Sequence, residues 1–151
     1  MMLGIDSPIR CSCGSYSCWE SHASEGATIA HYLRNTGAKT ANSEISLPMI
    51  ISLAQEGDRK AIETLRETGK FLGIGIANLI VGLSPQAVII NGEIIKAWDI
   101  IKDEILAIAE RGIIRDLPHP VIAASTLGDN PTLIGSLSLV LAKKFASAAK
   151  I

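Results

Sequence analysis

Three cysteines lie within eight consecutive residues near the start of the chain, and they constrain its fold more than any other feature. They are Cys11, Cys13 and Cys18, with the spacing C-x-C-x4-C, and the chain has no other cysteine. The loop that carries them is polar and has too little apolar content to fold alone. Three thiolates on one short loop can converge on a tetrahedral Zn²⁺, which would need one further ligand. The metal would then supply the folding energy of the loop.

Two other interpretations of the cysteine cluster are disfavoured. Three unrelated buried cysteines would not gather on a polar loop rich in turn-forming residues. A redox pair is typical of the spacing C-x-x-C, which is absent. The fourth metal ligand stays open, and its candidates are the histidines of the chain, His22, His31 and His119.

The composition indicates a folded, nearly neutral chain. Its 151 residues are 48% apolar and 19% charged, with 14 basic against 15 acidic side chains. A net charge of −1 lacks the positive potential expected of a nucleic-acid-binding protein. The most apolar stretch, residues 71–83, is shorter than the roughly 18 to 20 residues of a membrane span. The first six residues lack the features of a signal peptide, so we expect a cytoplasmic location.

The spacing of apolar residues predicts three helices in the middle of the chain, residues 19–84. We expect them over residues 19–37, 46–57 and 58–84. One face of the first helix is expected to be buried, and it comprises Ala23, Ala27, Ala30 and Leu33. The third helix contains glycines that weaken its helix propensity and predict a close backbone approach to a neighbouring helix or a ligand, namely Gly69, Gly73 and Gly75.

The tail of the chain, residues 87–148, alternates strands with helices. Continuous apolar runs at residues 87–90 and 120–124 predict two buried parallel strands, and residues 93–111 and 132–148 predict helices. This order is typical of α/β architecture with right-handed crossovers. Because a stable sheet usually needs three or more strands, residues 1–5 could supply a third. Otherwise the chain is part of a larger fold or associates with itself, and a dimer is the first expectation.

The cysteine motif and the two residues directly after it resemble the signature of a known family. Cys11-x-Cys13-Gly14-x-x-x-Cys18-Trp19-Glu20 is similar to the signature of the ROK family of sugar kinases and sugar-responsive repressors. Further resemblance lies in residues 72–80, 84–92 and 127–136. Trp19-Glu20 is similar to the glucokinases of the family, whereas many of its repressors have Leu-Glu.

This resemblance implies a fold and a structural metal. The fold would be the C-terminal half of an actin-like or ribonuclease H-like ATPase, α/β in class, incomplete and helix-rich. Residues 1–151 would form a single domain, with the zinc loop at residues 11–18. Cys11, Cys13 and Cys18 would hold a structural Zn²⁺.

The resemblance also implies roles in binding sugar and nucleotide. Glu20 would accept hydrogen bonds from sugar hydroxyls, although a favourable charge at a helix N-terminus is an alternative role. The turn Asn91-Gly92 would approach the nucleotide, which in the full-length enzyme would be ATP with Mg²⁺. Gly135 would let the last helix pack near that turn, with plain helix packing as the alternative.

The sequence departs from the family pattern at several places. The family takes its fourth zinc ligand from an E-x-G-H motif roughly ten residues before the first cysteine, which here falls at or before Met1. The D-x-G-x-T phosphate loop and the catalytic aspartate have no counterpart. Ser17 stands where the family has glycine, and Asn91 and Glu93 adjoin a turn where it has two or three glycines.

We therefore expect the C-terminal part of an ATP-dependent hexose kinase similar to glucokinase, inactive alone and without a catalytic residue of its own. An alternative is the sugar-sensing and dimerisation domain of a ROK-type repressor, and a third is a purely structural, zinc-dependent oligomerisation module. The expected partners are a hexose and a second copy of the chain, without a membrane and without nucleic acid bound by this chain itself.

Overall fold

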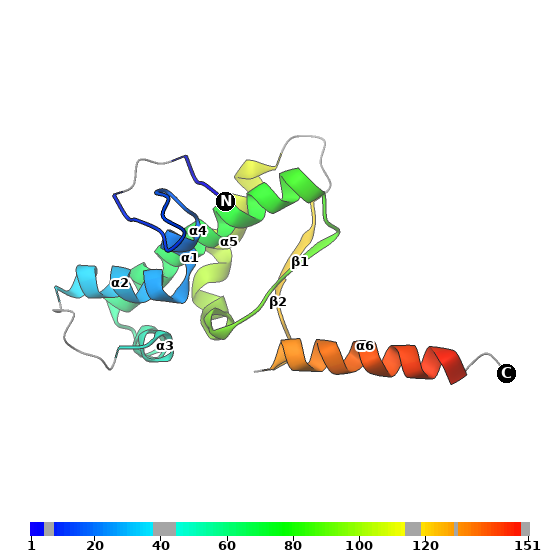
Figure 1. Cartoon of the computed structure of the whole chain (residues 1–151). Coiled ribbons are helices and arrows are strands. Elements are labelled where there is room, and N and C mark those ends of the chain that lie inside the picture. The colour runs from blue at the N-terminus through cyan, green and yellow to red at the C-terminus, as the bar shows by residue number, and fades with distance from the viewer. Residues whose placement is uncertain (5–7, 38–44, 114–118, 129, 149–151) are drawn as a thin grey trace.

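The chain folds into helices around one long central helix, with a small parallel sheet beside them (Figure 1). The computed structural model describes residues 1–4, 8–37, 45–113, 119–128 and 130–148, with side chains up to residue 142. In chain order the elements are α1 (Glu20–Ala23), α2 (Glu25–Thr36), α3 (Leu47–Gln55), α4 (Arg59–Leu83), β1 (Ala87–Ile90), the 3-10 helix η1 (Glu93–Ala97), α5 (Trp98–Gly112), β2 (Val121–Ala124) and α6 (Pro131–Ala148). Among the described helices, none has the length and apolar content to cross a membrane.

The central helix α4 begins and ends where its sequence predicts. The Asp58 carboxylate accepts a hydrogen bond from the backbone N–H of Ala61 at 2.7 Å, which satisfies one of the free donors of the first turn. At the other end Ser84 adopts a left-handed conformation and donates its N–H to the carbonyl of Ile80 at 2.9 Å. Pro85 follows and cannot continue the helix. The predicted helix over residues 58–84 is therefore confirmed.

The core forms where α2, α3 and α5 pack against α4. Each large apolar side chain buried there contributes about 1.5–3 kcal/mol relative to an exposed one. The largest fully buried apolar side chains are Ile50, Leu65, Ile80, Ile101 and Ile105.

Two glycines of α4 allow neighbours to approach its backbone closely, as the sequence predicts. A Cβ atom at Gly73 would lie 2.8 Å from the Cβ of Ile108 and 2.9 Å from the carbonyl oxygen of Ile105, both on α5. A Cβ atom at Gly75 would lie 2.7 Å from the indole of Trp19. A side chain at either position would push its neighbour away, so these glycines fix how α5 and the cysteine loop sit on α4.

The prediction of one continuous helix over residues 19–37 is wrong, because the chain forms two helices, α1 and α2, that are separated at Ser24. Ser24 is extended, and its hydroxyl accepts a hydrogen bond from the N–H of Ala27 at 3.2 Å, which starts α2 anew. Serine favours this capping role over a place inside a helix. The predicted buried face is also wrong: α2 buries Thr28 and Tyr32, while Ala30 is exposed.

The two predicted strands form and pair in parallel, with Ala87 opposite Val121. Their predicted burial is wrong, since Ile89 is 58% exposed and Val121 is 65% exposed. Val88 and Ile90 pack on the core, so helices cover one face of the pair and leave the other open. The possible third strand at residues 1–5 is an isolated bridge between Met2 and Cys18, and Ile5 lies outside the described residues.

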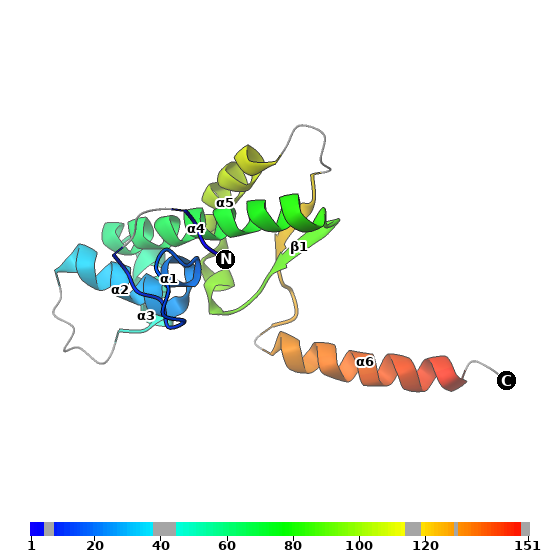
Figure 2. The same ribbon diagram turned by 45° about the horizontal axis from the view of Figure 1, so that its top comes forward.

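The two tail helices differ in how they attach to the body. The segment predicted as one helix over residues 93–111 starts as the 3-10 helix η1 and becomes α-helical at Trp98. The predicted last helix is confirmed as α6, which projects away from the rest of the chain in both views (Figures 1 and 2). Its large apolar side chains are exposed: Leu133, Ile134, Leu137, Leu139, Val140 and Leu141.

A buried pair of threonine hydroxyls joins α2 to α4, and its loss is expected to destabilise the chain. The hydroxyl oxygens of Thr28 and Thr68 lie 3.0 Å apart, and both side chains are buried. We expect Thr28→Val to lower the free energy of unfolding by about 0.5–1.5 kcal/mol, because Thr68 loses one hydrogen-bond partner but keeps its bond to the Thr64 carbonyl. Urea titration would measure the loss, with Thr132→Val on exposed α6 as the control. If the two variants lose equal stability, the buried pair contributes nothing of its own.

Candidate functional site

The cysteine loop is a tight double turn held by backbone hydrogen bonds. The N–H of Cys11 donates to Ser15 at 2.8 Å, and the N–H of Gly14 donates back to Cys11 at 2.9 Å. A bridge between Arg10 and Tyr16 closes the base of the loop, and the next residues pair with the first few of the chain. This folding brings cysteines that lie up to seven positions apart onto one side of the loop.

Ser17 adopts a backbone conformation that usually favours glycine. Its φ angle is +59°, in the left-handed region that costs a residue with a Cβ about 1–2 kcal/mol. Gly14 also has a positive φ, +89°, and is glycine as expected. The substitution at position 17 therefore keeps the turn and stores some strain in it.

The three sulfur atoms are placed as a metal site requires. All three lie within 4.8 Å of one another, and the Sγ atoms of Cys13 and Cys18 are 3.5 Å apart. Zn–S bonds of about 2.3 Å in a tetrahedron would separate sulfurs by roughly 3.8 Å. The cysteines are free, with Cys11 buried and Cys13 exposed. Cys11, Cys13 and Cys18 could therefore hold a metal ion.

The loop lowers the pKa of one cysteine thiol and raises that of another. The backbone N–H of Cys13 is the main cause that lowers the pKa of Cys11 to about 6, since it stabilises the thiolate. The neighbouring Cys13 side chain and burial raise the pKa of Cys18 to about 11. A bound divalent cation would compensate the negative charges that these sulfurs otherwise impose on one another.

The described histidines do not join the sulfurs. Within the described part of the chain, the metal-ligand cluster contains only the three cysteines. The His22 ring packs 4.6 Å from the Phe71 ring, centroid to centroid. His31 lies on α2, where burial and the charge of Arg34 lower its pKa. His119 is exposed just before β2.

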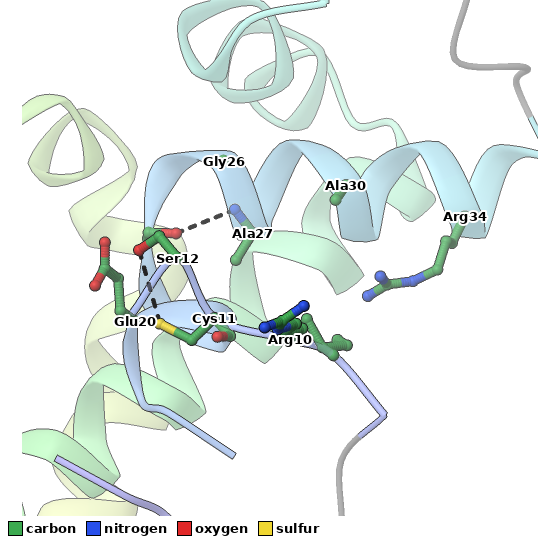
Figure 3. A pocket seen from close by; sticks show the side chains of 11 residues that line it. Arg10, Cys11, Ser12, Glu20, Gly26, Ala27, Ala30 and Arg34 are labelled. Carbon is green, nitrogen blue, oxygen red and sulfur yellow. Dashed lines mark hydrogen bonds between the residues drawn. The ribbon is translucent and has the colours of Figure 1, made fainter. Parts of the chain in front are cut away.

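Glu20 lines a pocket directly beside the cysteine loop (Figure 3). It is the first residue of α1, its side chain is exposed, and the structure gives its carboxylate no hydrogen-bond partner among the described residues. The pocket has a volume of about 290 Å³. It lies between the loop and α2, and its lining includes Arg10, Ser12, Ser21, Ala27, Ala30 and Arg34.

The α2 side of this pocket is not among the features predicted from the sequence. Ala27 and Ala30 are predicted core residues, whereas in the structure they line the pocket together with Arg34. The signal is present in the sequence, because Ala30 and Arg34 are four residues apart and share one face of a helix.

A second hollow, of about 530 Å³, lies where the two parallel strands end. The predicted turn Asn91-Gly92 forms one wall, and Ser125, Thr126 and Gly128 after β2 form the other. Gly92 has a φ of +102°, which favours glycine there. Ligands bind characteristically outside the carboxyl ends of parallel strands. Gly135 is part of α6 and does not line this hollow, so the structure leaves it apart from Asn91 and Gly92.

The sequence of this chain is similar to those of sugar kinases and repressors of one family. The family model described as "ROK family" matches residues 2–143. The xylose repressor of Bacillus subtilis is 30% identical over 142 residues, which cover 93% of this chain and 35% of the repressor. The glucokinase of Streptomyces coelicolor is 27% identical over 145 residues, covering 87% of this chain and 46% of the glucokinase. The chain thus spans about a third to a half of the length of these relatives.

Solved structures of ROK family proteins are also similar to this chain. A ROK family glucokinase from Streptomyces griseus, solved with glucose and AMPPNP, superposes with a TM-score of 0.71 at 24% identity, over 92% of this chain and 49% of that one. A ROK family transcriptional regulator, homologous to the Escherichia coli MLC protein, superposes with a TM-score of 0.68 at 27% identity. The match covers 82% of this chain and 33% of the regulator. The sugar kinases among these neighbours have the actin-like ATPase fold, which confirms the predicted fold class. The chain belongs to the ROK family.

Proposed function

We propose that this chain is the sugar-binding C-terminal part of an ATP-dependent hexose kinase similar to glucokinase. The observation that carries the proposal is the Glu20 carboxylate at the mouth of its pocket, with both oxygens available to a ligand. An ionised carboxylate only accepts hydrogen bonds, so it suits paired sugar hydroxyls. The glucokinase from Streptomyces griseus, solved with glucose, supports this assignment through its similar fold.

Zinc is the metal that we propose for the three cysteines. Thiolate ligands on one turn are typical of structural zinc, which would contribute stability to the loop and no chemistry to the reaction. Glu20 begins its helix two residues after Cys18, so a metal-ordered loop would fix where the carboxylate lies. The fourth ligand would come from outside the three cysteines.

We place the nucleotide at the hollow beyond the strands, with Asn91 and Gly92 on its wall. Its position at the carboxyl ends of a parallel pair supports this, and Lys96 lines the same hollow. Gly135 is proposed to approach the turn only when α6 packs against it. The D-x-G-x-T motif of a phosphate loop does not occur in the sequence, and we assign none of the aspartates as the catalytic base, so we expect no phosphoryl transfer from this chain on its own.

Substitution of Glu20 tests sugar binding directly. We expect Glu20→Gln to weaken the binding of glucose by about tenfold or more, because charge-assisted hydrogen bonds contribute about 1.5–3 kcal/mol. Isothermal titration calorimetry with glucose and xylose would measure the affinities. The matched control is Glu25→Gln, an exposed carboxylate in the first turn of α2. Unchanged glucose affinity in Glu20→Gln would remove the proposed role.

A second candidate is the sugar-sensing and dimerisation domain of a ROK-type repressor. The 30% identity with the xylose repressor of Bacillus subtilis, over 93% of this chain, favours it. The exposed apolar face of α6 offers a surface for self-association. Titration with AMPPNP distinguishes the candidates: a kinase part binds the nucleotide at the Asn91-Gly92 turn, so Gly92→Val would abolish that binding. Sugar binding without nucleotide binding would favour the repressor.

A further inference from the structure

The pocket beside the cysteine loop carries opposite charges at its two ends. Figure 3 shows the Glu20 carboxylate at one end and the guanidinium groups of Arg10 and Arg34 at the other, with the Arg34 side chain reaching from α2 toward Arg10. Between them lie small side chains, including Ala27 and Ala30. A ligand in this pocket therefore meets an acceptor at one end and two cationic donors at the other.

The positive charge at the arginine end is not neutralised by the residues that the structure describes. Neither Arg10 nor Arg34 makes an ion pair with any carboxylate in that part of the chain, although lysine–carboxylate pairs form elsewhere on the surface. Burial lowers the pKa of His31, and the positive charge of Arg34 lowers it further. Two like charges facing one pocket raise the local concentration of anions.

Both arginines are held on fixed backbone. Arg10 pairs with Tyr16 at the base of the cysteine loop and directly precedes Cys11. Arg34 lies in the last turn of α2, one helical turn beyond Ala30. A guanidinium group only donates hydrogen bonds and matches the two oxygens of a phosphate or carboxylate in a planar fork. Neutral sugar hydroxyls alone would leave most of these donors to water.

We propose that Arg10 and Arg34 form an anion subsite, so that the pocket takes a sugar bearing an oxyanion group, with Glu20 on its hydroxyls. This inference rests on the proposed sugar site and extends it to the class of ligand. The volume of about 290 Å³ is at the small end of ligand pockets, which suits one hexose unit with one small acidic group. The acidic group is a phosphate or a carboxylate, because both fit the same donors.

Calorimetric titration of the full chain at low ionic strength tests the subsite. The probes are glucose 6-phosphate, glucuronate, glucose and inorganic phosphate. We expect at least one acidic sugar to bind about tenfold more tightly than glucose, and the gain to vanish in Arg10→Ala/Arg34→Ala. High salt should reduce the gain, since the arginines are exposed. Arg66→Ala, an exposed arginine on α4 that lines none of the described pockets, is the matched control.

The outcomes separate this inference from the proposed function. Equal affinities for glucose and both acidic sugars would overturn the subsite and leave the sugar site intact. A gain that persists in the double variant would also overturn it, provided that circular dichroism shows the variant folded. If the variant does not fold, Arg34→Lys replaces it, and a fully retained gain in that variant counts against the forked recognition. Inorganic phosphate bound through the two arginines, without binding of any sugar, would support the subsite and refute the sugar site.

Discussion

If the three cysteines hold zinc as proposed, replacement of Cys18 by serine is expected to abolish zinc binding and to unfold the loop beside Glu20. The three sulfurs lie within 4.8 Å of one another, so the loss of one leaves two thiolates for a cation that prefers four ligands. We expect the affinity for zinc to fall by about 100-fold or more, because structural zinc contributes on the order of 10 kcal/mol to the folding of such loops. Metal content and competition with a chromogenic chelator would measure the change.

Ser15→Ala is the control for this substitution. Ser15 is exposed in the same loop, and only its backbone carbonyl takes part in the turn, so its side chain is dispensable. If Cys18→Ser retains one zinc per chain with unchanged affinity, the cysteines are not the ligand set. If the wild-type chain takes up no zinc at all, the metal proposal is wrong altogether.

The second large effect is expected at Trp19, which ties the cysteine loop to the central helix. Its indole N–H donates to the carbonyl of Phe71 at 2.6 Å, and its ring lies against Gly75. We expect Trp19→Ala to lower the free energy of unfolding by about 3–5 kcal/mol, because it leaves a cavity between the loop and α4. Since Trp19 stands between Cys18 and Glu20, the same variant should also weaken the proposed binding of zinc and of sugar.

A second substitution at Trp19 separates packing from hydrogen bonding, and a control in the same loop accompanies it. Trp19→Phe keeps most of the ring contact and loses the N–H donor, so we expect a smaller loss of about 1–3 kcal/mol. Tyr16→Ala removes an aromatic ring that is 52% exposed in the same loop and should change little. Chemical denaturation of the three variants gives the comparison. A loss in Trp19→Ala no larger than in Tyr16→Ala would show that the loop is not anchored by this ring.

The elements that could be predicted from the sequence are those with strong local signals. Asp58 ahead of an apolar period predicted the start of α4, and its cap hydrogen bond is present. The β-branched run before Asn91-Gly92 predicted β1 with its bounds. In both cases the local preference and the tertiary packing agree, and such agreement makes a pattern reliable.

The errors arose where local preferences competed or where tertiary packing decides. Ser24 fitted the apolar period of one continuous helix, yet its hydroxyl caps a new one. The apolar run at residues 87–90 indicated burial on both faces, but burial depends on what covers the sheet, which a strand's own residues do not contain. At the site, the cysteine trio was predictable from spacing alone, whereas Arg10 and Arg34, 24 positions apart, line one pocket only through folding.

The two-stranded sheet of the described residues leaves an unpaired outer edge on each strand, which affects how the chain must be handled. Among the residues that the structure describes, each strand pairs only with the other, so its outer side carries backbone donors and acceptors without a strand partner. Such an edge is a template for any extended segment that reaches it, whatever the sequence of that segment. Concentrated samples therefore risk strand addition between molecules, and dilution should be the first remedy tried against aggregation.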